Sequence, residues 1–365
     1  MQFYLVGGAV RDQLLGVDVH EKDWVVVGAT PEALTARGYV PVGKDFPVFL
    51  HPFTKEEYAL ARTERKTGRG YAGFCFYTDP SITLEQDLAR RDLTINAMAQ
   101  DSDGQIIDPF GGQKDLRTRT FRHVSPAFCE DPVRILRLAR FASRFADFNI
   151  HPSTITLLKK MVADGEAHAL VAERVWQELK KALDCEQPHR FFTTLITADA
   201  CAAIFPEIAQ HPDGITALQN AKTCTDPIVK LAIVLQALPL TEATALCQRL
   251  RIPKKYQSLA LQVIKQCDQW RSLAINDAAA VADFLKTADA VRQPERFAAM
   301  LHTFTYCFDD HPLKQTIITG ALQAVNDVSV TDLVAAGFKG PAFAEQLQQK
   351  KIHAIEVFLS TQENT

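Results

Sequence analysis

Segments that read as β-strands are confined to the first third of this chain. Short runs rich in β-branched and aromatic residues, such as 3–6 and 24–27, are bounded by glycine or aspartate, as strands often are. Thr30 and Pro31 are typical of a helix start. From about Pro132 onward, apolar residues recur only at helical spacing. The sequence therefore predicts an α+β protein, in which a small head with a mixed β-sheet and helices precedes an all-α neck, body and tail.

The length of 365 residues exceeds the size at which one hydrophobic core usually stops growing, so we expect at least two modules. Prolines divide the helical part of the chain into clusters of helices. We expect four regions, namely 1–122 as the head, 123–206 as the neck, 207–275 as the body and 276–365 as the tail.

Composition excludes several classes of protein. Hydrophobic residues make up 47% and charged residues 23%, which is ordinary for a globular protein and rules out wholesale disorder. The formal charge of -3 gives no global basic field, so any nucleic-acid binding must come from local runs. The eight cysteines are isolated, which argues against a zinc site and indicates a reducing compartment. Without a signal-peptide pattern or an apolar run of about 20 residues, we expect a cytoplasmic protein with no membrane partner.

Two glycines, Gly7 and Gly8, follow the first predicted strand and open the first predicted helix. Paired glycines at such a turn allow backbone N–H groups to approach a phosphate, and a helix start favours its negative charge. Gly8 is therefore a candidate for phosphate binding. Any tight strand-to-helix turn could use the same glycines without a ligand, so the glycines alone leave both interpretations open.

Glu21 and Asp23 are separated by one residue and lie directly before an apolar run. On a strand they would point to the same face, where two carboxylates repel each other unless a cation lies between them. Magnesium prefers oxygen ligands of this kind and keeps open positions for phosphates. A solvated turn is the alternative, but the apolar run indicates a central strand, where an unpaired acid is costly. We therefore expect a magnesium site at Glu21 and Asp23.

The glycine pair with Arg11 and Asp12, followed by the acid pair, resembles the head of the class II tRNA nucleotidyltransferases. These are the CCA-adding enzymes and their relatives, the bacterial poly(A) polymerases. Further motifs of that family follow in the same order, at 90–97, 108–112, 130–137 and 173–178. The resemblance implies a form without the C-terminal phosphohydrolase domain of longer relatives, because the adjacent residues 309–311 lack its spaced pattern.

The sequence departs from the family at the metal site. The first carboxylate is usually an aspartate, whereas Glu21 carries one more methylene group, so ideal octahedral geometry is not assured. Some relatives place a third carboxylate on the strand that corresponds to 58–61, which has no acid and is flanked by Glu57 and Glu64. The third ligand is left unassigned.

Four arginines recur at spacings of three, three and four along one predicted helix, namely Arg134, Arg137, Arg140 and Arg144. A solvated basic face is the ordinary explanation of such a pattern. Asp131 is adjacent to Arg134, and an acceptor beside a donor can pair with the edge of cytosine or adenine, whereas guanine and uracil present the opposite order. The resemblance implies this base-reading role for the two residues. It also implies that Arg11, Arg91, Arg137 and Arg140 contact the triphosphate.

Two further segments carry expectations. The segment 61–74 combines four basic residues with three glycines and matches the family's flexible loop, although a merely solvated loop would have the same composition. Glu173, Arg174 and Glu178 are expected to brace the arginine helix through ion pairs, as structural residues.

The resemblance implies template-independent addition of CCA to the 3′ end of tRNA from CTP and ATP, with Mg²⁺ as cofactor and the tRNA acceptor end as partner. The helical regions after the head would grip the tRNA. Three alternatives stay open, namely a poly(A) polymerase, an enzyme that adds only CC, and a non-catalytic tRNA-binding relative.

Overall fold

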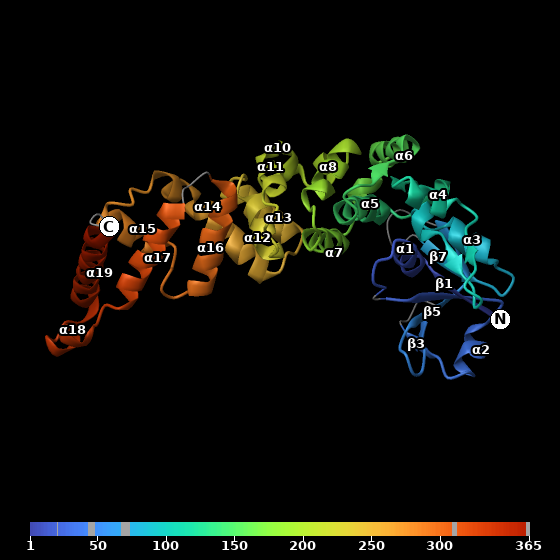
Figure 1. The fold of residues 1–365 in the computed structure, drawn as a ribbon, viewed down its shortest axis with the longest axis horizontal. Coiled ribbons are helices and arrows are strands. Elements are labelled where there is room, and N and C mark those ends of the chain that lie inside the picture. Colours follow the sequence, from blue (N-terminus) through green and yellow to red (C-terminus); the bar gives the residue numbers. More distant parts are fainter. Residues whose placement is uncertain (20, 43–47, 67–73, 309–311, 363–365) are drawn as a thin grey trace. The chain divides into compact units, whose positions relative to one another are not determined.

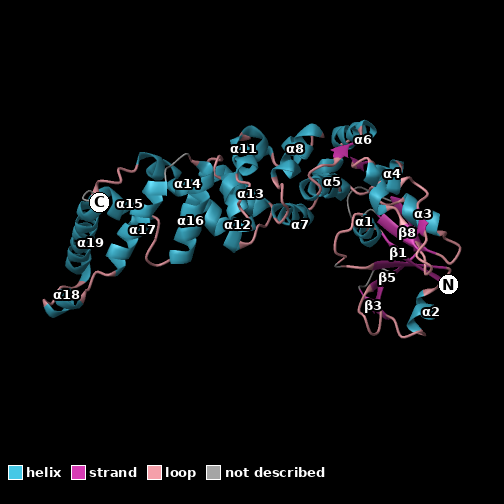
Figure 2. Ribbon diagram, in the orientation of Figure 1, coloured by secondary structure: helices cyan, strands magenta, loops and turns pink. Residues whose placement is uncertain are grey.

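The computed structural model describes residues 1–19, 21–42, 48–66, 74–308 and 312–362. The chain divides into two compact units, residues 1–206 and 207–365. Within the described residues all strands belong to the first unit, and the second unit is built from helices and connecting loops (Figures 1 and 2). The predicted α+β class is confirmed. The four-region division stays a prediction.

The head contains most of the strands and four short helices. Its strands are β1 (Gln2–Val6), β2 (Asp23–Val27), β3 (Val40–Val42), β4 (Val48–Leu50), β5 (Glu57–Leu60), β6 (Arg62–Lys66), β7 (Phe74–Thr78), β8 (Ala99–Gln100), β9 (Ile106–Ile107) and β10 (Thr120–Phe121). Its helices are α1 (Gly8–Leu14), α2 (Pro31–Thr35), α3 (Leu84–Ala89) and α4 (Gly112–Arg117). The strand order of the main sheet is β3-β4-β5-β2-β1-β8-β9, which makes β2 the central strand.

Strand β2 is buried on both faces of the sheet. Val25 packs into the cluster that contains Val6 and Leu88, whereas its neighbour Val26 packs with Leu34 on the other face. Successive side chains of a strand point to opposite faces, so a continuous run of valines is what a strand covered on both sides requires. The predicted central position of this strand is confirmed.

The structure corrects the expectation that Glu21 and Asp23 both lie on this strand. β2 begins at Asp23, which is paired with Val6, the last residue of β1. Beyond Val6 the chain turns at Gly7 into α1, so β1 offers no backbone partner to residues before Asp23. Glu21 therefore lies in the turn that precedes the strand.

The expectation of a loop over 61–74 is wrong for its first part. Residues 62–66 form β6, which pairs antiparallel with β7 from Arg62 opposite Thr78 to Lys66 opposite Phe74. A basic composition does not prevent this ladder, because the hydrogen bonds come from the backbone. Residues 67–73 lie outside the described residues.

The rest of the first unit is mainly helical. It contains α5 (Val133–Arg144), β11 (Asn149–Ile150), α6 (Pro152–Ala163), α7 (Ala172–Leu183), α8 (His189–Thr197) and α9 (Cys201–Ile204). α5 packs against both α7 and α8. Its apolar residues, among them Ile135, Leu136 and Leu138, are buried, so one side of α5 is fixed in the core.

The second unit begins with α10 (Pro206–Gln210) at the boundary. It continues with α11 (Asp213–Asn220), α12 (Pro227–Leu235), α13 (Leu240–Arg249), α14 (Lys254–Ser272), α15 (Ala278–Thr287), α16 (Pro294–Cys307), α17 (Pro312–Asn326), α18 (Thr331–Ala335) and α19 (Gly340–Gln362). Aromatic rings fill its core, where Trp270 stacks on Phe304 with ring centres 4.9 Å apart. Among the described residues, no helix is both long enough and apolar enough to cross a membrane.

Candidate active site

One cavity of the first unit, with a volume of about 560 Å³, brings together all nine residues expected at the site from the sequence. Its lining comes from α1, the start of β2 and the turn before it, β6, the segment after α3, α5 with the residues before it, and α7. It consists of Gly7, Gly8, Arg11, Glu21, Asp23, Arg62, Arg90, Arg91, Asp92, Asn96, Asp131, Arg134, Arg137, Arg140, Phe141, Arg144, Arg174 and Lys181. Ten of these side chains are basic and four are acidic. Such a surplus of positive charge in a hollow attracts a polyanion.

The glycines let an arginine approach the turn before α1. Gly7 has a φ of 71°, in the left-handed region, and a Cβ atom built there would lie 2.7 Å from Nη1 of Arg91. A larger residue would therefore be strained and would displace Arg91. The turn thus requires glycine at position 7, because a side chain there would displace an arginine that lines the cavity.

Glu21 and Asp23 both line the cavity, and within the described residues neither side chain forms an ion pair or hydrogen bond. Lys22, between them, lies instead 3.9 Å from Glu56. Burial raises the pKa of Asp23; Arg91 opposes this, and the negative charge of Glu21 adds to it. Two neighbouring carboxylates that face a cavity and form no direct ion pair within the described residues fit a divalent cation.

The same acid pair borders a second, smaller hollow of about 330 Å³. Glu57 lines that hollow and is the partner of Asp23 in the parallel pairing of β2 with β5. A set of three His, Cys, Asp or Glu side chains arranged to hold a metal is absent from the described residues, so Glu57 remains unassigned.

Arg11 is the most deeply buried cation of the cavity. It donates to Oδ1 of Asp12 at 2.8 Å and to Oδ1 of Asn96 at 2.6 Å. Its guanidinium lies 5.3 Å and 5.2 Å from the ring centres of Phe141 and Phe145. Burial lowers the pKa of Arg11, and Asp12 opposes this. Arg11 therefore links α1 of the head to α5.

Asp92 holds one arginine of α5 in place. Its carboxylate accepts hydrogen bonds from Nε of Arg137 at 2.8 Å and from Nδ2 of Asn96 at 2.9 Å. Burial alone would raise the pKa of Asp92, but the charge of Arg137 and these hydrogen bonds hold it well below its usual range. In return, Asp92 raises the pKa of Arg137. The side chains of Asp92 and Asn96 were not predicted as site residues, although both belong to the 90–97 motif.

The arginines of α5 do not form a solvated basic face. Arg134 is buried and donates to the backbone oxygens of Ala127 and Arg90. Arg140 pairs with Glu178 at 2.5 Å, and Arg144 pairs with Asp12 at 3.0 Å. Each arginine of the row thus has a specific acceptor, and the alternative of a merely solvated face is wrong.

Arg174 was expected only to brace α5, but it also lines the cavity. Its Nη1 and Nη2 donate to the two carboxylate oxygens of Asp131 at 3.3 Å and 3.2 Å. The N–H of Val133 donates to Oδ1 of the same carboxylate at 3.0 Å. Asp131 is thus oriented by two elements, the start of α5 and α7. Asp131 and Arg174 lie 43 residues apart in the sequence, so no local pattern predicted this ion pair.

Comparisons with known proteins agree with this geometry. The poly(A) polymerase head domain family matches residues 3–122, and the family described as the probable RNA and SrmB-binding site of polymerase A matches residues 147–211. The CCA-adding enzyme of Coxiella burnetii is 50% identical over 99% of this chain and 96% of its own length. The multifunctional CCA protein of Alkalilimnicola ehrlichii is 46% identical over 97% of each chain.

Solved structures share the fold. A CCA-adding enzyme in an apo form superposes with a TM-score of 0.71 at 24% identity, over 98% of this chain and 92% of the other. The Thermotoga maritima CCA-adding enzyme, solved in complex with tRNA, gives a TM-score of 0.69 at 22% identity, over 99% and 91%. Because half of all residues are shared with a relative along nearly the full length of both chains, the chain belongs to the family of CCA-adding enzymes.

Proposed function

We propose that this chain adds the nucleotides C, C and A to the 3′ end of tRNA, using CTP and ATP and no nucleic-acid template. The observation that carries the proposal is the acid pair Glu21 and Asp23, which lines a cavity with ten basic side chains and forms no direct ion pair with any of them among the described residues. A carboxylate pair suits metal-assisted phosphoryl chemistry, and the surrounding cations suit a triphosphate. Residues 1–122 would be the catalytic head, 123–206 the neck with the base-reading helix, and 207–275 and 276–365 the body and tail that hold tRNA.

Glu21 and Asp23 are the residues that would hold Mg²⁺, because they are the oxygen donors of the cavity that lack a protein partner among the described residues. Bound there, Mg²⁺ would activate the primer hydroxyl and neutralise the charge of the triphosphate. Glu21, with its extra methylene group, lies in the turn before β2 rather than on the strand. The backbone of this turn is not fixed by the hydrogen bonds of the sheet.

The arginines would bind and orient the triphosphate. Arg137 presents its guanidinium from a fixed position, because its Nε is held by Asp92. Arg91 is likewise held by Asp87, at 3.2 Å. Gly8 and Arg11 complete the proposed phosphate contacts at the start of α1, and Arg140 extends them along α5. Positions fixed before binding reduce the cost of ordering side chains around the substrate.

Base choice would rest on Asp131 and Arg134. An ionised carboxylate offers about four lone-pair sites, of which Arg174 occupies two and the N–H of Val133 one. One site remains for the amino group of cytosine or adenine, while Arg134 donates to the adjacent ring acceptor. Guanine and uracil would leave these groups unpaired, at a cost of about 1–3 kcal/mol for each group.

Incubation of a tRNA transcript that lacks its 3′ CCA with CTP, ATP and Mg²⁺ tests the function. We expect addition of three nucleotides. Addition of only two would identify a CC-adding enzyme, and a long A-tail would identify a poly(A) polymerase, which the match to the poly(A) polymerase head domain makes the second candidate. If no nucleotide is incorporated, the remaining alternative is a non-catalytic tRNA-binding relative. Competition among the four NTPs with Arg134→Ala tests the base reading, because unchanged exclusion of UTP and GTP would contradict it.

A further inference from the structure

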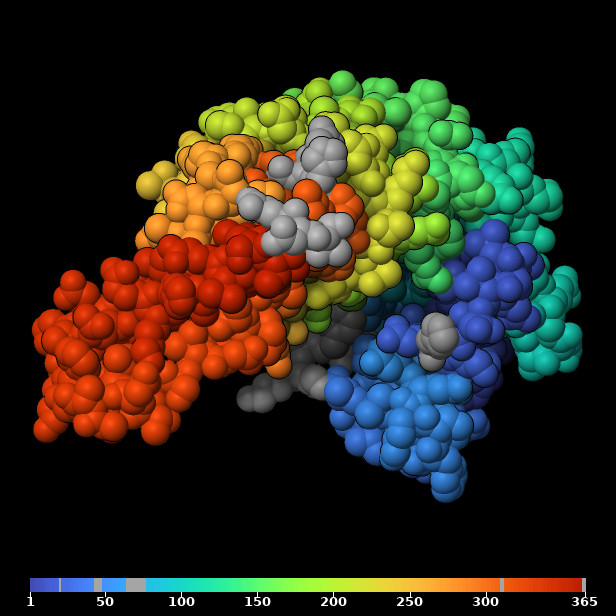
Figure 3. Space-filling view, turned by 60° about the vertical axis from the view of Figure 1, so that its left-hand side comes forward, coloured from blue at the N-terminus to red at the C-terminus, as the bar shows by residue number. Residues whose placement is uncertain are grey.

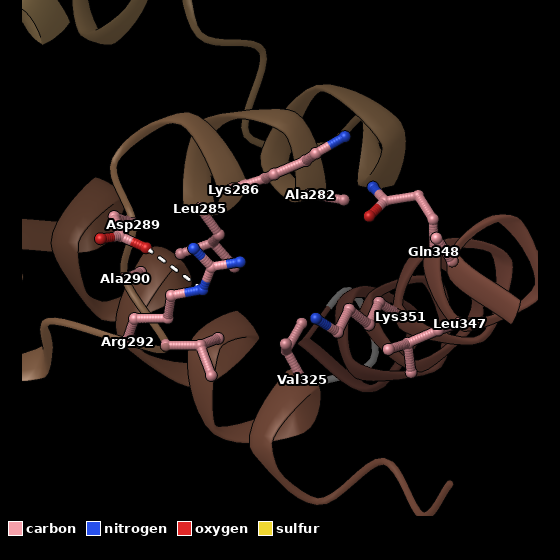
Figure 4. A pocket seen from close by; sticks show the side chains of 12 residues that line it. Ala282, Leu285, Lys286, Asp289, Ala290, Arg292, Val325, Leu347, Gln348 and Lys351 are labelled. Carbon is pink, nitrogen blue, oxygen red and sulfur yellow. Dashed lines mark ion pairs between the residues drawn. The ribbon is translucent and has the colours of Figure 1, made fainter. Parts of the chain in front are cut away.

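The second unit contains a separate cavity of about 480 Å³ between α15, α17 and α19. Its lining consists of Ala282, Leu285, Lys286, Asp289, Ala290, Val291, Arg292, Val325, Ala344, Leu347, Gln348 and Lys351. In Figure 4 the side chains of Arg292, from the turn after α15, and of Lys351, from α19, end beside the opening, and Lys286 of α15 runs along its upper edge. The helix α19 forms part of the outer surface of this unit, shown in red in Figure 3.

The floor and the rim of this cavity differ in chemistry. Leu285 and Val325 are buried and contribute an apolar floor. The side chain of Arg292 is 86% exposed on the rim, where it lies 3.9 Å from Asp289, the one acid of the lining. Within the described residues, Lys286 and Lys351 form no ion pair. The cavity therefore offers apolar contact below and an excess of positive charge above.

The three basic residues of the lining lie in a region of the chain whose formal charge is negative. Residues 276–365 contain more Asp and Glu than Lys and Arg, yet three of the basic residues surround this one opening. A local group of cations at a hollow raises the concentration of anions there, so an anionic group favours this opening over the rest of the acidic region.

We propose that this cavity binds one nucleotide of the RNA substrate, with its base or ribose on the apolar floor and its phosphate among Lys286, Arg292 and Lys351. The volume falls within the range of sites that enclose small organic groups. A phosphate ion alone would make no contact with the apolar floor, and an apolar group alone would make no ion pair with the cations of the rim. Three cations beside one acid leave a formal surplus of two positive charges, which is enough for one phosphodiester but not for the full charge of a free triphosphate. The inference rests on the proposed function for the presence of RNA.

The first test removes the charge. Lys286→Ala/Arg292→Ala changes two exposed side chains, and the binding of a fluorescently labelled tRNA transcript without CCA is followed by anisotropy over a range of salt concentrations. We expect about five- to tenfold weaker binding, and a log–log salt dependence that is shallower by about one unit for each phosphate that the variant no longer neutralises. Lys339→Ala is the matched control, since Lys339 is exposed in the same unit but does not line the cavity. Wild-type affinity and salt slope in the double variant would overturn the proposal.

The second test fills the cavity. Ala344 lines it from an exposed position, so Ala344→Trp occupies the space without disturbing the core. We expect a comparable loss of tRNA affinity with an unchanged melting temperature and an unchanged KM for CTP. If this variant keeps full tRNA affinity, the cations act only through general surface charge. That result would overturn the proposal that the cavity binds a nucleotide. A raised KM for CTP with normal tRNA binding would identify a free-nucleotide site instead, which also overturns it.

Both tests measure RNA binding rather than turnover. If tRNA binds through this cavity but no CMP is incorporated, the proposed function fails while the pocket stands. If CCA is added normally and neither variant changes tRNA binding, the pocket fails while the proposed function stands.

Discussion

The cavity of the first unit and the cavity beside α19 are both lined by cationic side chains, but only the first anchors them on buried acids. Asp92 and Asp87 fix Arg137 and Arg91, whereas Lys286 and Lys351 have no ion-pair partner among the described residues. Anchored cations keep one geometry, which suits the alignment of reacting groups. Unanchored cations adapt to a flexible chain, which suits a backbone contact. The predictions below separate these two designs.

The largest effect is expected at the acid pair. Asp23→Ala should lower incorporation of CMP and AMP by at least about a thousandfold, or about 4 kcal/mol in barrier, while tRNA affinity stays near wild type. Single-turnover assays with saturating tRNA measure this, and Asp18→Ala is a control on an exposed acid of the preceding turn. Turnover within tenfold of wild type would contradict the metal assignment.

The next effect concerns the anchoring acid. Asp92→Asn should lower kcat/KM for CTP about a hundredfold and the free energy of unfolding by about 2–3 kcal/mol, less than for a fully buried pair because the Arg137 side chain is 38% exposed. Because the folded-state pKa of Asp92 is depressed, its contribution is present above the unfolded pKa of about 3.9 and is lost as the pH falls toward the folded value. Urea unfolding at pH 6 and pH 3 should therefore show a smaller gap between wild type and variant at pH 3. An equal gap at both pH values would argue against this pair.

Arg174 should affect selectivity more than stability. Arg174→Leu frees the Asp131 carboxylate to rotate, so we expect about a tenfold loss of preference for CTP over UTP, or about 1.4 kcal/mol. Arg174→Lys should restore part of it, since lysine keeps the charge but not the two parallel N–H donors. Competitive incorporation reports the ratio, and thermal melting separates it from misfolding. A variant that melts earlier but selects normally would show that Arg174 is only a brace.

The smallest effect is expected at the unanchored rim. Lys286→Arg should change tRNA affinity by no more than about twofold, because an adaptable phosphate contact tolerates either cation. The matched change Arg137→Lys should cost about tenfold or more in incorporation, since lysine cannot reproduce the Nε hydrogen bond to Asp92. Equal tolerance at both positions would remove the distinction between the two cavities.

Local patterns predicted much of the fold. Thr30 caps α2 through the N–H of Ala33, with Pro31 as the first helical residue, as expected. The valines of β2 indicated a central strand, because consecutive apolar residues point to both faces of a sheet and so require burial on both. The start of β2 at Asp23 could not be predicted, because it depends on where β1 ends. The hairpin of β6 and β7 was missed for a similar reason, since composition does not reveal backbone pairing.

The site was predicted where its residues fall within recognisable motifs. What could not be predicted is which acid holds which arginine. Asp92 meets Arg137 across 45 residues, and Asp12 meets Arg144 across 132 residues. Only the packing of α5 against the head determines these pairs, and no spacing along the chain encodes them.

The contacts between α1 and α5 also bear on how the protein is made. During synthesis the head leaves the ribosome first, with Asp92 and Arg11 already in place but without Arg137 and Phe141, which follow later in the chain. At about 5–20 residues per second, the 45 residues between Asp92 and Arg137 take about 2–9 s to be added. During this interval the head carries a carboxylate without its charge partner, so we expect a nascent head to remain incompletely formed. The catalytic cavity would then appear only when the neck has emerged, and an unfinished chain would not be able to consume nucleotides.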